Sequence, residues 1–176
     1  MNKEFLKKDS IRKAEPKDAR SIIDIIKSVH IDKGINRSEG FLASRDLSEE
    51  SYIKMIEKYE YCYVFEIDKK VAGFLIVSSS DSMDKASEIY SYLAEINPHE
   101  DFNYIFQVAV DRKFKRMGIA TMLYNRLFDD CGGKLMVITS KNPLNQASRN
   151  FHLKLGFRGM QESLNGATEL KAMFTI

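Results

Sequence analysis

One stretch decides the fold: Gln107-Val108-Ala109-Val110-Asp111-Arg112-Lys113-Phe114-Lys115-Arg116-Met117-Gly118-Ile119-Ala120-Thr121. It begins as an apolar strand and passes through a basic turn into an amphipathic helix. The first amides of a helix have no partner within it and lie at the positive end of its dipole, so they bind anions. Gly118 removes the side chain that would keep an anion off the backbone, and Lys115 and Arg116 add charge. The stretch predicts a phosphate site, although an ordinary strand-to-helix connection with solvated lysines has the same composition.

Within this stretch, Lys115-Arg116-Met117-Gly118-Ile119-Ala120 resembles the acyl-CoA-binding signature of the GNAT N-acetyltransferase superfamily, Arg/Gln-x-x-Gly-x-Gly/Ala. Two positions depart from the usual pattern. A lysine stands at the first position, where the family uses main-chain amides. Arg116 stands where a further glycine is common, so its Cβ must point away from the pyrophosphate.

A second motif lies one helix and one strand further along the chain, as the family order requires. Residues 145–157, Asn-Gln-Ala-Ser-Arg-Asn-Phe-His-Leu-Lys-Leu-Gly-Phe, resemble the signature Asn-x-x-Ala/Ser-x-x-Phe/Leu-Tyr-x-x-x-Gly-Phe. His152 stands where the family commonly has tyrosine. With both motifs in this order, the chain is identified as a member of the GNAT superfamily.

Length and composition are those of one soluble domain. The chain has 176 residues, of which 44% are hydrophobic and 30% charged, and this is enough to bury a core. A net charge of +2 is too small to indicate nucleic acid or an anionic membrane as partner. The basic run of the signature has only Phe114 as an aromatic residue, whereas single-strand-binding surfaces usually offer several. We therefore expect a single domain over residues 1–176 with neither kind of partner.

Location and metal content are also expected from the sequence. No apolar run approaches the roughly 20 residues that span a bilayer, and residues 1–4 lack the start of a signal-peptide core. Cys62 and Cys131 make no disulfide framework and no metal cluster, so we expect two buried thiols. The expected compartment is the cytoplasm, and no metal is expected.

Hydrophobic periodicity predicts an alternation of strands and helices. Apolar residues at helical spacing predict helices at about 16–29, 48–59, 85–96, 117–131 and 145–155. Runs rich in β-branched and aromatic residues predict strands at 11–14, 61–67, 71–77, 103–110, 134–139, 157–162 and 168–176. Residues 34–47 are expected to be loop.

The resemblance implies an α/β fold with a mixed, mostly antiparallel sheet of about six or seven strands. In this fold, helices flank the sheet, and the fourth and fifth strands splay apart. Residues 79–102 form an insertion relative to the common family pattern. We interpret it either as a lid or wall over the acceptor side or as a surface elaboration that only packs.

The resemblance also implies acetyl-CoA as co-substrate and assigns residues to it. Its pyrophosphate would lie on the amides of Arg116, Met117, Gly118, Ile119, Ala120 and Thr121, with Lys115 at the rim. Its pantetheine arm would pair with the backbone of Val108, Ala109 and Val110. Asn145 either contacts the cofactor arm or only caps its helix. Phe151 is either part of the core or a contact of the cofactor.

The catalytic groups are less well defined. A backbone N–H near Val108 would polarise the thioester oxygen. His152 either protonates the leaving thiolate in place of the usual tyrosine or is a partly exposed helix histidine without that role. Strict alternation puts Tyr104, Phe106, Val108 and Val110 on one face of the central strand, and none of them is a carboxylate. Deprotonation of the amine would then run through ordered water, with help from Tyr104.

The sequence therefore predicts an N-acetyltransferase that moves the acetyl group of acetyl-CoA to a primary amine by direct attack in a ternary complex. The acceptor, a small molecule or a peptide amine, stays open, as does the choice between monomer and homodimer. The alternative is a catalytically weak acyl-CoA-binding sensor or subunit, which the histidine in the tyrosine position favours.

Overall fold

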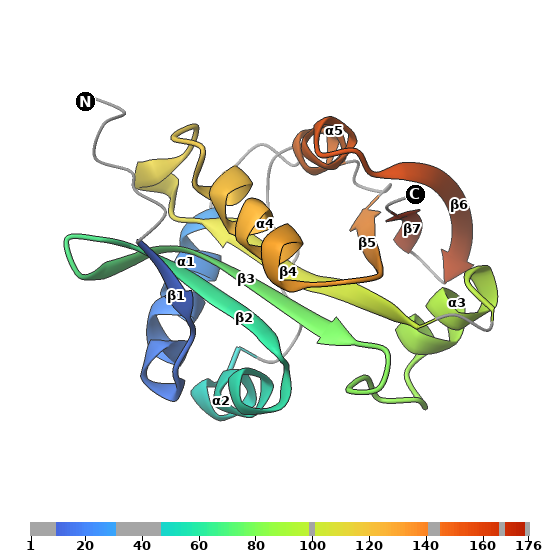
Figure 1. The fold of residues 1–176 in the computed structure, drawn as a ribbon, viewed down its shortest axis with the longest axis horizontal. Helices are drawn as coiled ribbons and strands as arrows, with labels where there is room; N and C mark the ends of the chain where they lie inside the picture. The colour runs from blue at the N-terminus through green and yellow to red at the C-terminus, as the bar shows by residue number, and fades with distance from the viewer. Residues whose placement is uncertain (1–9, 31–46, 99–100, 141–144, 166–167, 175–176) are drawn as a thin grey trace. The chain divides into compact units, whose positions relative to one another are not determined.

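A computed structural model describes residues 10–30, 47–98, 101–140, 145–165 and 168–174. The predicted alternation of strands and helices is confirmed (Figure 1). Helix α3 begins at Glu88 and not near residue 85, because Ser87 is its N-cap. The loop expected at 34–47 lies outside the described residues except for Leu47. The elements are β1 (Ile11–Lys13), η3 (Pro16–Asp18), α1 (Ala19–Val29), α2 (Glu49–Lys58), β2 (Tyr61–Ile67), β3 (Lys70–Ser79), α3 (Glu88–Ile96), β4 (Phe102–Val110), η5 (Arg112–Phe114), α4 (Ile119–Asp130), β5 (Lys134–Ser140), α5 (Gln146–Lys154), β6 (Arg158–Asn165) and β7 (Thr168–Phe174).

The described strands form a seven-stranded sheet in the order β1-β2-β3-β4-β5-β7-β6. Strand β2 pairs antiparallel with β1 and β3, and β7 pairs antiparallel with β5 and β6, whereas β4 and β5 are parallel. The expected mixed, mostly antiparallel sheet is therefore confirmed. The β4–β5 register runs only from Phe102↔Lys134 to Ile105↔Val137, although β4 continues to Val110. This short register agrees with the splay that the resemblance implies.

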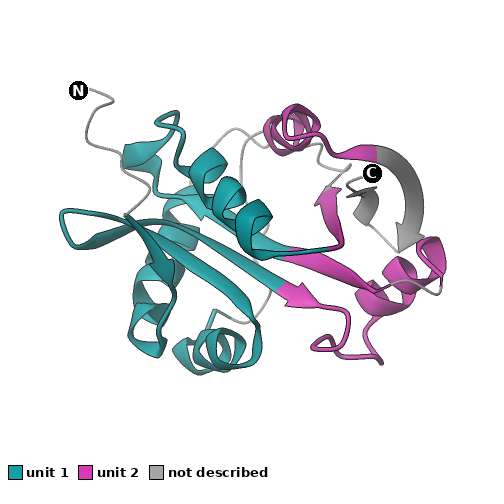
Figure 2. Cartoon of the chain, viewed as in Figure 1, with its two compact units in different colours: residues 1–35, 41–77, 106–132 teal, residues 36–40, 78–105, 133–176 magenta. Residues whose placement is uncertain are grey.

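The chain divides by its contacts into two compact units (Figure 2). Unit 1 comprises residues 1–35, 41–77 and 106–132, and unit 2 comprises residues 36–40, 78–105 and 133–176. Both units take residues from β3 and from β4. The single domain expected over residues 1–176 stays a prediction.

The core of unit 1 is built on the apolar face of α1. Ile22, Ile25, Ile26 and Val29 recur at helical spacing and are at most 4% exposed. Each contributes about 1.5–3 kcal/mol through burial. The cluster that contains them also includes Tyr52 and Ile56 of α2, Cys62 and Val64 of β2, Phe74 and Ile76 of β3, and Ala109 of β4. Burial raises the pKa of Cys62 to about 12, so this thiol acts as a small apolar side chain.

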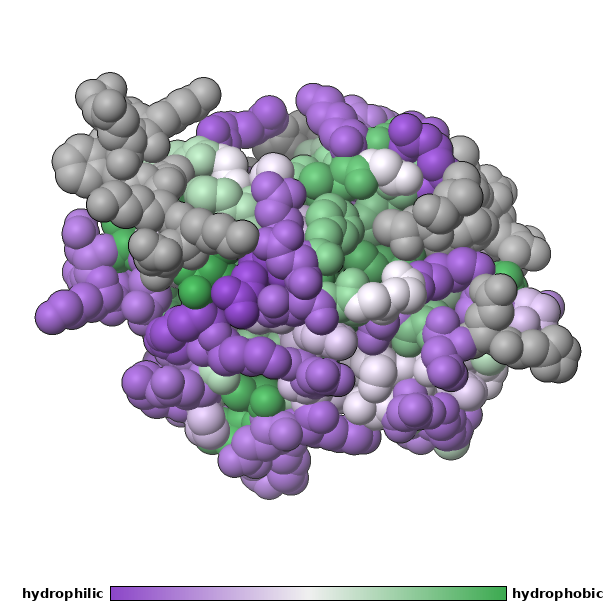
Figure 3. All heavy atoms as spheres, in the orientation of Figure 1, coloured by the Kyte–Doolittle hydropathy of each residue, from purple (hydrophilic) through white to green (hydrophobic). Residues whose placement is uncertain are grey.

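Unit 2 has its own buried residues on β4, β5 and α3. Leu93 of α3 is fully buried, and the parallel strands bury Phe102, Ile105, Leu135 and Met136. Outside such cores, hydrophilic side chains cover much of the face seen in Figure 3, with apolar residues between them.

Gly73 of β3 allows a close approach within unit 1. A Cβ at this position would lie 2.9 Å from Cγ2 of Ile119 and 3.2 Å from the carbonyl oxygen of Ala109. Real Cβ atoms essentially never show a contact of 2.9 Å, and 3.2 Å is tighter than most, so glycine is what lets β3 pack closely against Ala109 and the first residue of α4. The position of the α4 N-terminus therefore depends on a glycine 46 residues earlier in the sequence.

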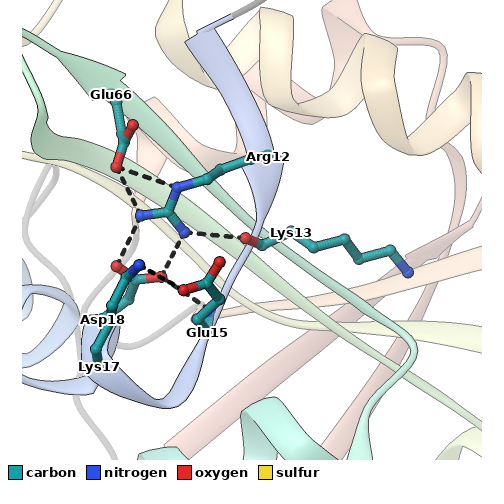
Figure 4. Close-up of polar contacts among 6 residues, drawn as sticks. All are labelled: Arg12, Lys13, Glu15, Lys17, Asp18 and Glu66. Atoms are coloured by element: carbon teal, nitrogen blue, oxygen red, sulfur yellow. Dashed lines mark hydrogen bonds and ion pairs between the residues drawn. The ribbon is translucent and has the colours of Figure 1, made fainter.

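Arg12 of β1 lies at the centre of a polar network in unit 1 (Figure 4). Its Nη1 and Nη2 donate to the two carboxylate oxygens of Asp18 at 2.6 and 2.9 Å, and Nη2 and Nε donate to Oε1 of Glu66 at 2.6 and 3.1 Å. Nη1 also donates to the Lys13 carbonyl at 3.0 Å. All five N–H groups of the guanidinium are used, which fastens β1 to β2 and to the start of α1.

Asp18 accepts from this arginine while it is 4% exposed. Burial by itself raises the pKa of Asp18, but hydrogen bonds from Arg12 and from the Glu15 N–H outweigh it, and the pKa lies below its ordinary value. The carboxylate therefore stabilises the fold wherever it is ionised in both the folded and unfolded states. This contribution is present above the ordinary pKa near 4 and is lost as the pH falls through the lower, folded pKa.

We expect Arg12→Met to lower the free energy of unfolding by about 2 kcal/mol at pH 7, because Asp18 is left buried without its charged partner. The deficit should shrink as the pH falls toward and below 4, because without Arg12 burial raises the pKa of Asp18 and the variant takes up the proton first. Urea denaturation at several pH values measures both effects. The control is Arg20→Met, because Arg20 forms ion pairs with Asp24 and Glu49 at the exposed surface, where such pairs stabilise little. Equal losses in the two variants would contradict the structural role of Arg12.

Candidate functional site

The turn after β4 is held by hydrogen bonds at Asp111. The Asp111 N–H donates to the carbonyl of Ala72 in β3 at 2.9 Å, and Oδ1 of Asp111 accepts from the Lys113 N–H at 2.8 Å. The Phe114 N–H donates to the Asp111 carbonyl at 2.9 Å and completes η5. The basic side chains of Arg112 and Lys113 stay exposed. A rigid, positively charged turn thus joins β4 to α4.

Two residues at the start of α4 have left-handed backbone conformations. Gly118 has φ +85°, and Arg116 has φ +65°. The left-handed region costs a side-chain-bearing residue about 1–2 kcal/mol, which accounts for the glycine that the GNAT signature commonly has in place of Arg116. The two left-handed residues turn the chain sharply into the helix.

The first-turn amides of α4 are not capped by a side chain. The first α-helical bond runs from the Met122 N–H to the Gly118 carbonyl at 3.0 Å, so the N–H groups of Ile119, Ala120 and Thr121 have no partner within the helix. The N-cap is Gly118, and no side-chain cap is formed. A Cβ at Gly118 would meet no atom within 4 Å, so the space around this N-cap position is open.

Three other described α-helices are capped by a side chain. Ser48 of α2, Ser87 of α3 and Asn145 of α5 each accept a hydrogen bond from a first-turn N–H through the side chain. Helix α1 follows directly from η3, which occupies its first N–H groups differently. The start of α4 therefore has the donors, the dipole and the exposed charge that fit an anionic group.

The buried residues of α4 hold its first turn in place. Ile119 is 1% exposed and lies against Gly73, while Leu123, Tyr124 and Leu127 are fully buried. Arg116 and Thr121 are exposed, and Lys115, Met117 and Ala120 are half-buried. The signature residues from Lys115 to Thr121 thus lie at the start of α4, and Val108 to Val110 of β4 belong to the same unit.

Strand β4 does not keep strict alternation. Phe102 and Tyr104 are buried in its first half, but Ile105, Gln107 and Ala109 are buried in its second half. The buried set shifts by one residue between Tyr104 and Ile105, where the register with β5 also ends. The prediction that Tyr104 shares one face with Phe106, Val108 and Val110 requires unbroken alternation along the strand. Tyr104 is 6% exposed, whereas the other three residues are half-buried. Its catalytic role stays a prediction.

Helix α5 places the residues of the second motif in unit 2. Oδ1 of Asn145 accepts from the Ser148 N–H at 2.9 Å, so the helix-capping role is present, and a cofactor contact stays a prediction. Phe151 is half-buried, and its ring lies edge-on to His152 at 5.5 Å between centroids. A contact between Phe151 and the cofactor also stays a prediction.

His152 is buried, with 1% of its surface exposed, so its interpretation as a partly exposed helix histidine is wrong. Its ring lies between Phe151 and Phe157, with centroids 5.5 and 5.2 Å away. Nδ1 is 2.8 Å from the Ser148 carbonyl, which can only accept, so Nδ1 carries the proton.

Burial lowers the pKa of His152 to about 4, against a smaller opposing effect of the Ser148 carbonyl. At pH 7 only about 0.1% of such rings are cationic. This is the environment of a neutral, packed histidine. The acid role of His152 stays a prediction that this environment does not favour.

The insertion is anchored within unit 2. Nζ of Lys85 donates to the Ser80 carbonyl at 2.7 Å, and Nζ of Lys134 donates to Oδ1 of Asn97 at 2.6 Å. The first bond lies within the loop before α3, and the second ties the C-cap of α3 to β5. The contact of the insertion with an acceptor stays a prediction.

The described residues hold no group of three or more His, Cys, Asp or Glu side chains that could bind a metal ion. None of their helices combines the length and the apolar character that crossing a bilayer requires.

Sequence reasoning missed two features of unit 1. One is Gly73, whose contact with Ile119 is described above. The other is Gln107, a polar residue in an apolar strand, whose Oε1 accepts from the hydroxyl of Tyr52 at 2.9 Å. The sequence could have indicated this role of Gln107, because a polar side chain buried between Phe106 and Val108 in an apolar strand needs a hydrogen-bond partner.

Comparison with known families agrees with this geometry. Residues 30–157, which are most of the chain, match the model of the Acetyltransferase (GNAT) family. The chain belongs to the GNAT family and is an acetyltransferase. No sequence among the curated proteins is similar enough to count as a match.

Solved structures show the same fold at low sequence identity. A GNAT-family acetyltransferase from Streptococcus agalactiae is 17% identical with a TM-score of 0.68, and 94% of each chain is covered. An N-acetyltransferase from Staphylococcus aureus is 23% identical with a TM-score of 0.62, covering 94% of this chain and 99% of that one. The ribosomal-protein-S18-alanine N-acetyltransferase of Escherichia coli is 17% identical with a TM-score of 0.62, covering 94% and 91%.

We expect Gly118→Ala to weaken the binding of coenzyme A roughly tenfold, because a methyl group enters the space beside the first-turn amides and charged hydrogen bonds are lost. Titration calorimetry measures the affinity. The matched control is Gly133→Ala, since Gly133 also has a positive φ, of +82°, and open space around its Cβ. Both variants should lose about 1 kcal/mol of stability, but only the first should bind coenzyme A less tightly. Equal affinities would exclude this helix end as the site.

We expect the free energy of unfolding to fall as the pH is lowered from 7 to 4, because the unfolded chain protonates His152 and the folded chain does not. The folded pKa near 4 lies below the ordinary 6.5, so the stabilisation is complete above pH 6.5 and is lost toward pH 4, by up to about 3 kcal/mol. Denaturation of wild type and His152→Phe at each pH measures the effect, because the stability of wild type relative to the variant should fall by about 3 kcal/mol between pH 7 and pH 4. If His152 only packs and donates no proton, the folded His152→Phe variant should have the kcat of wild type at saturating substrates. A large loss of kcat would support the acid role of His152.

Proposed function

We propose that the chain moves the acetyl group of acetyl-CoA to a primary amine by direct attack in a ternary complex. The GNAT family generally uses acetyl-CoA. The observation that carries the proposal is the glycine-capped start of α4, whose first-turn amides open to unfilled space beside a basic turn. An anionic cofactor tail is the ligand that such a helix end suits.

The proposed hold on the cofactor uses main-chain groups of unit 1. The amides from Arg116 to Thr121 bind the pyrophosphate, and Lys115 adds charge at the rim. The backbone of Val108, Ala109 and Val110 pairs with the pantetheine arm as an added strand would. Support comes from the β4–β5 register, which includes no residue of β4 after Ile105. Asn145 and Phe151 are further proposed contacts.

When bound, acetyl-CoA supplies an acetyl thioester. The N–H of Val108 is the proposed donor that polarises its oxygen, a contribution typically worth about 10² to 10³ in rate. From Phe106 to Val110, strand β4 carries no carboxylate, so the amine loses its proton through ordered water. Tyr104 is the proposed aid to this step. Positioning and polarisation, more than acid–base groups, then carry the rate.

A catalytically weak acyl-CoA-binding sensor is the second candidate. It is favoured by His152, which stands in the tyrosine position of the second motif as a buried, neutral ring. The two candidates share the cofactor site and differ only in turnover. Calorimetry with acetyl-CoA and release of free thiol on addition of amines distinguish them: heat with amine-dependent release indicates transfer, and heat without release indicates a sensor.

The acceptor panel should include peptide amines, because one similar structure is an N-acetyltransferase for an alanine of a ribosomal protein. Small alkylamines and a polyamine represent the small-molecule acceptors. Thiol release without amine serves as the blank for hydrolysis.

We expect kcat/KM for an alkylamine to rise nearly tenfold per pH unit between pH 6 and 9. An amine of pKa near 10 is only about 0.1% neutral at pH 7, and no carboxylate on β4 from Phe106 to Val110 takes up its proton. For a peptide N-terminus the rise should level off near pH 8, the ordinary pKa of an α-amino group. Initial rates at subsaturating amine give the profile. A flat profile would contradict slow deprotonation.

A further inference from the structure

A buried polar pair joins α2 to β4 in unit 1. The hydroxyl of Tyr52 donates to Oε1 of Gln107 at 2.9 Å, with exposures of 0% for Tyr52 and 6% for Gln107. Tyr52 belongs to an apolar cluster with Ile22, Ile26 and Ile56. Burying a glutamine in such surroundings costs free energy unless its polar groups are satisfied, and Tyr52 satisfies only the oxygen.

The hydrogen bond from Tyr52 fixes the orientation of the amide. With Oε1 toward Tyr52, the two N–H donors on Nε2 are directed elsewhere. Among the described residues, Tyr52 is the only hydrogen-bond partner of this side chain, and none of their fully buried side-chain nitrogens or oxygens lacks a partner. Nε2 therefore reaches the small accessible part of Gln107.

Aromatic side chains lie against the apolar cluster that contains Tyr52. Phe106 and Tyr59 are half-buried there, with ring centroids 6.3 Å apart in an edge-to-face arrangement. Binding sites commonly combine such apolar walls with a few polar groups. Gln107 also directly precedes Val108, whose N–H is the proposed thioester donor, and it lies two residues beyond the end of the β4–β5 register.

We propose that Gln107 is a specificity-determining residue of the acceptor subsite and that Tyr52 is its positioning residue. Nε2 donates a hydrogen bond to an oxygen next to the acceptor amine. The acceptor class is thus an α-amino amide, such as a peptide N-terminus, in preference to a plain alkylamine or a polyamine. This inference rests on the proposed acetyl transfer.

The charge on β4 agrees with this choice. From Phe106 to Val110 the strand has no carboxylate to bind a second ammonium group, as a polyamine would require. An N–H donor attracts a carbonyl oxygen and repels a cation. The two N–H donors of Gln107 have no oxygen to bind on an alkylamine, so they would not distinguish one alkylamine from another.

The test compares kcat/KM for alaninamide with that for isopropylamine, which has a methyl group in place of the carboxamide. The two amines differ in pKa, so each rate is expressed per neutral amine. We expect wild type to prefer alaninamide, and Gln107→Leu to lower the preference roughly 3- to 10-fold, the equivalent of one hydrogen bond. Tyr52→Phe should lower it less, because the amide is still present but no longer held. KM for acetyl-CoA should stay unchanged in both.

Tyr63→Phe is the matched control. Tyr63 is also buried in unit 1, and its hydroxyl also donates to a side-chain oxygen, that of Asp130, at 2.6 Å. A structural effect alone would lower stability in both tyrosine variants and leave the preference intact in both. That result, or an unchanged preference in a folded Gln107→Leu, overturns the inference while acetyl transfer stands. If wild type binds acetyl-CoA but acetylates neither amine nor any other amine of the panel, the proposed function fails first, and the inference fails with it.

Discussion

Every helix has to provide partners for its first N–H groups, and α4 differs from its neighbours in how it does so. Helices α2, α3 and α5 use a serine or asparagine side chain as the partner. Helix α4 begins at a glycine that has no side chain to offer, and so its amides are available to a ligand. The left-handed conformation of Arg116 at this helix end costs about 1–2 kcal/mol of stability. A binding site is a sufficient reason for such a cost to persist.

Those donors are useful only if the helix end is held still, and unit 1 provides the support. Gly73 lets β3 approach Ile119 closely, and the Asp111 N–H ties the turn to Ala72 on the same strand. Strand β3 pairs with β2, which Arg12 fastens to β1 and to the start of α1 through Glu66 and Asp18. The polar network and the close-packed glycine thus serve one purpose, since both fix the sheet on which the helix end rests.

The helices and strands could be predicted from the sequence because burial of one face imposes the spacing of apolar residues on which the prediction was based. The apolar residues of α1 from Ile22 to Val29 could be placed on one face without knowing what they contact. Properties that depend on a distant segment could not be predicted. A glycine in a strand does not reveal which segment approaches it, and the partners Tyr52 and Gln107 are 55 residues apart. The break in alternation along β4 is likewise invisible, because Tyr104 and Ile105 are both apolar enough to be buried.

His152 shows the same limit at the level of chemistry. Its place in the motif suggested a proton donor, but its protonation depends on burial beside Phe157 and on the Ser148 carbonyl, which only the fold reveals. A neutral histidine there is nonetheless compatible with acyl transfer. An ordinary thiol has a pKa near 8.5, so a thiolate can leave without a proton, whereas an attacking amine must lose one first. The step that most needs help is therefore deprotonation of the amine, and residues that orient the neutral amine at β4 should influence the rate more than an acid on α5.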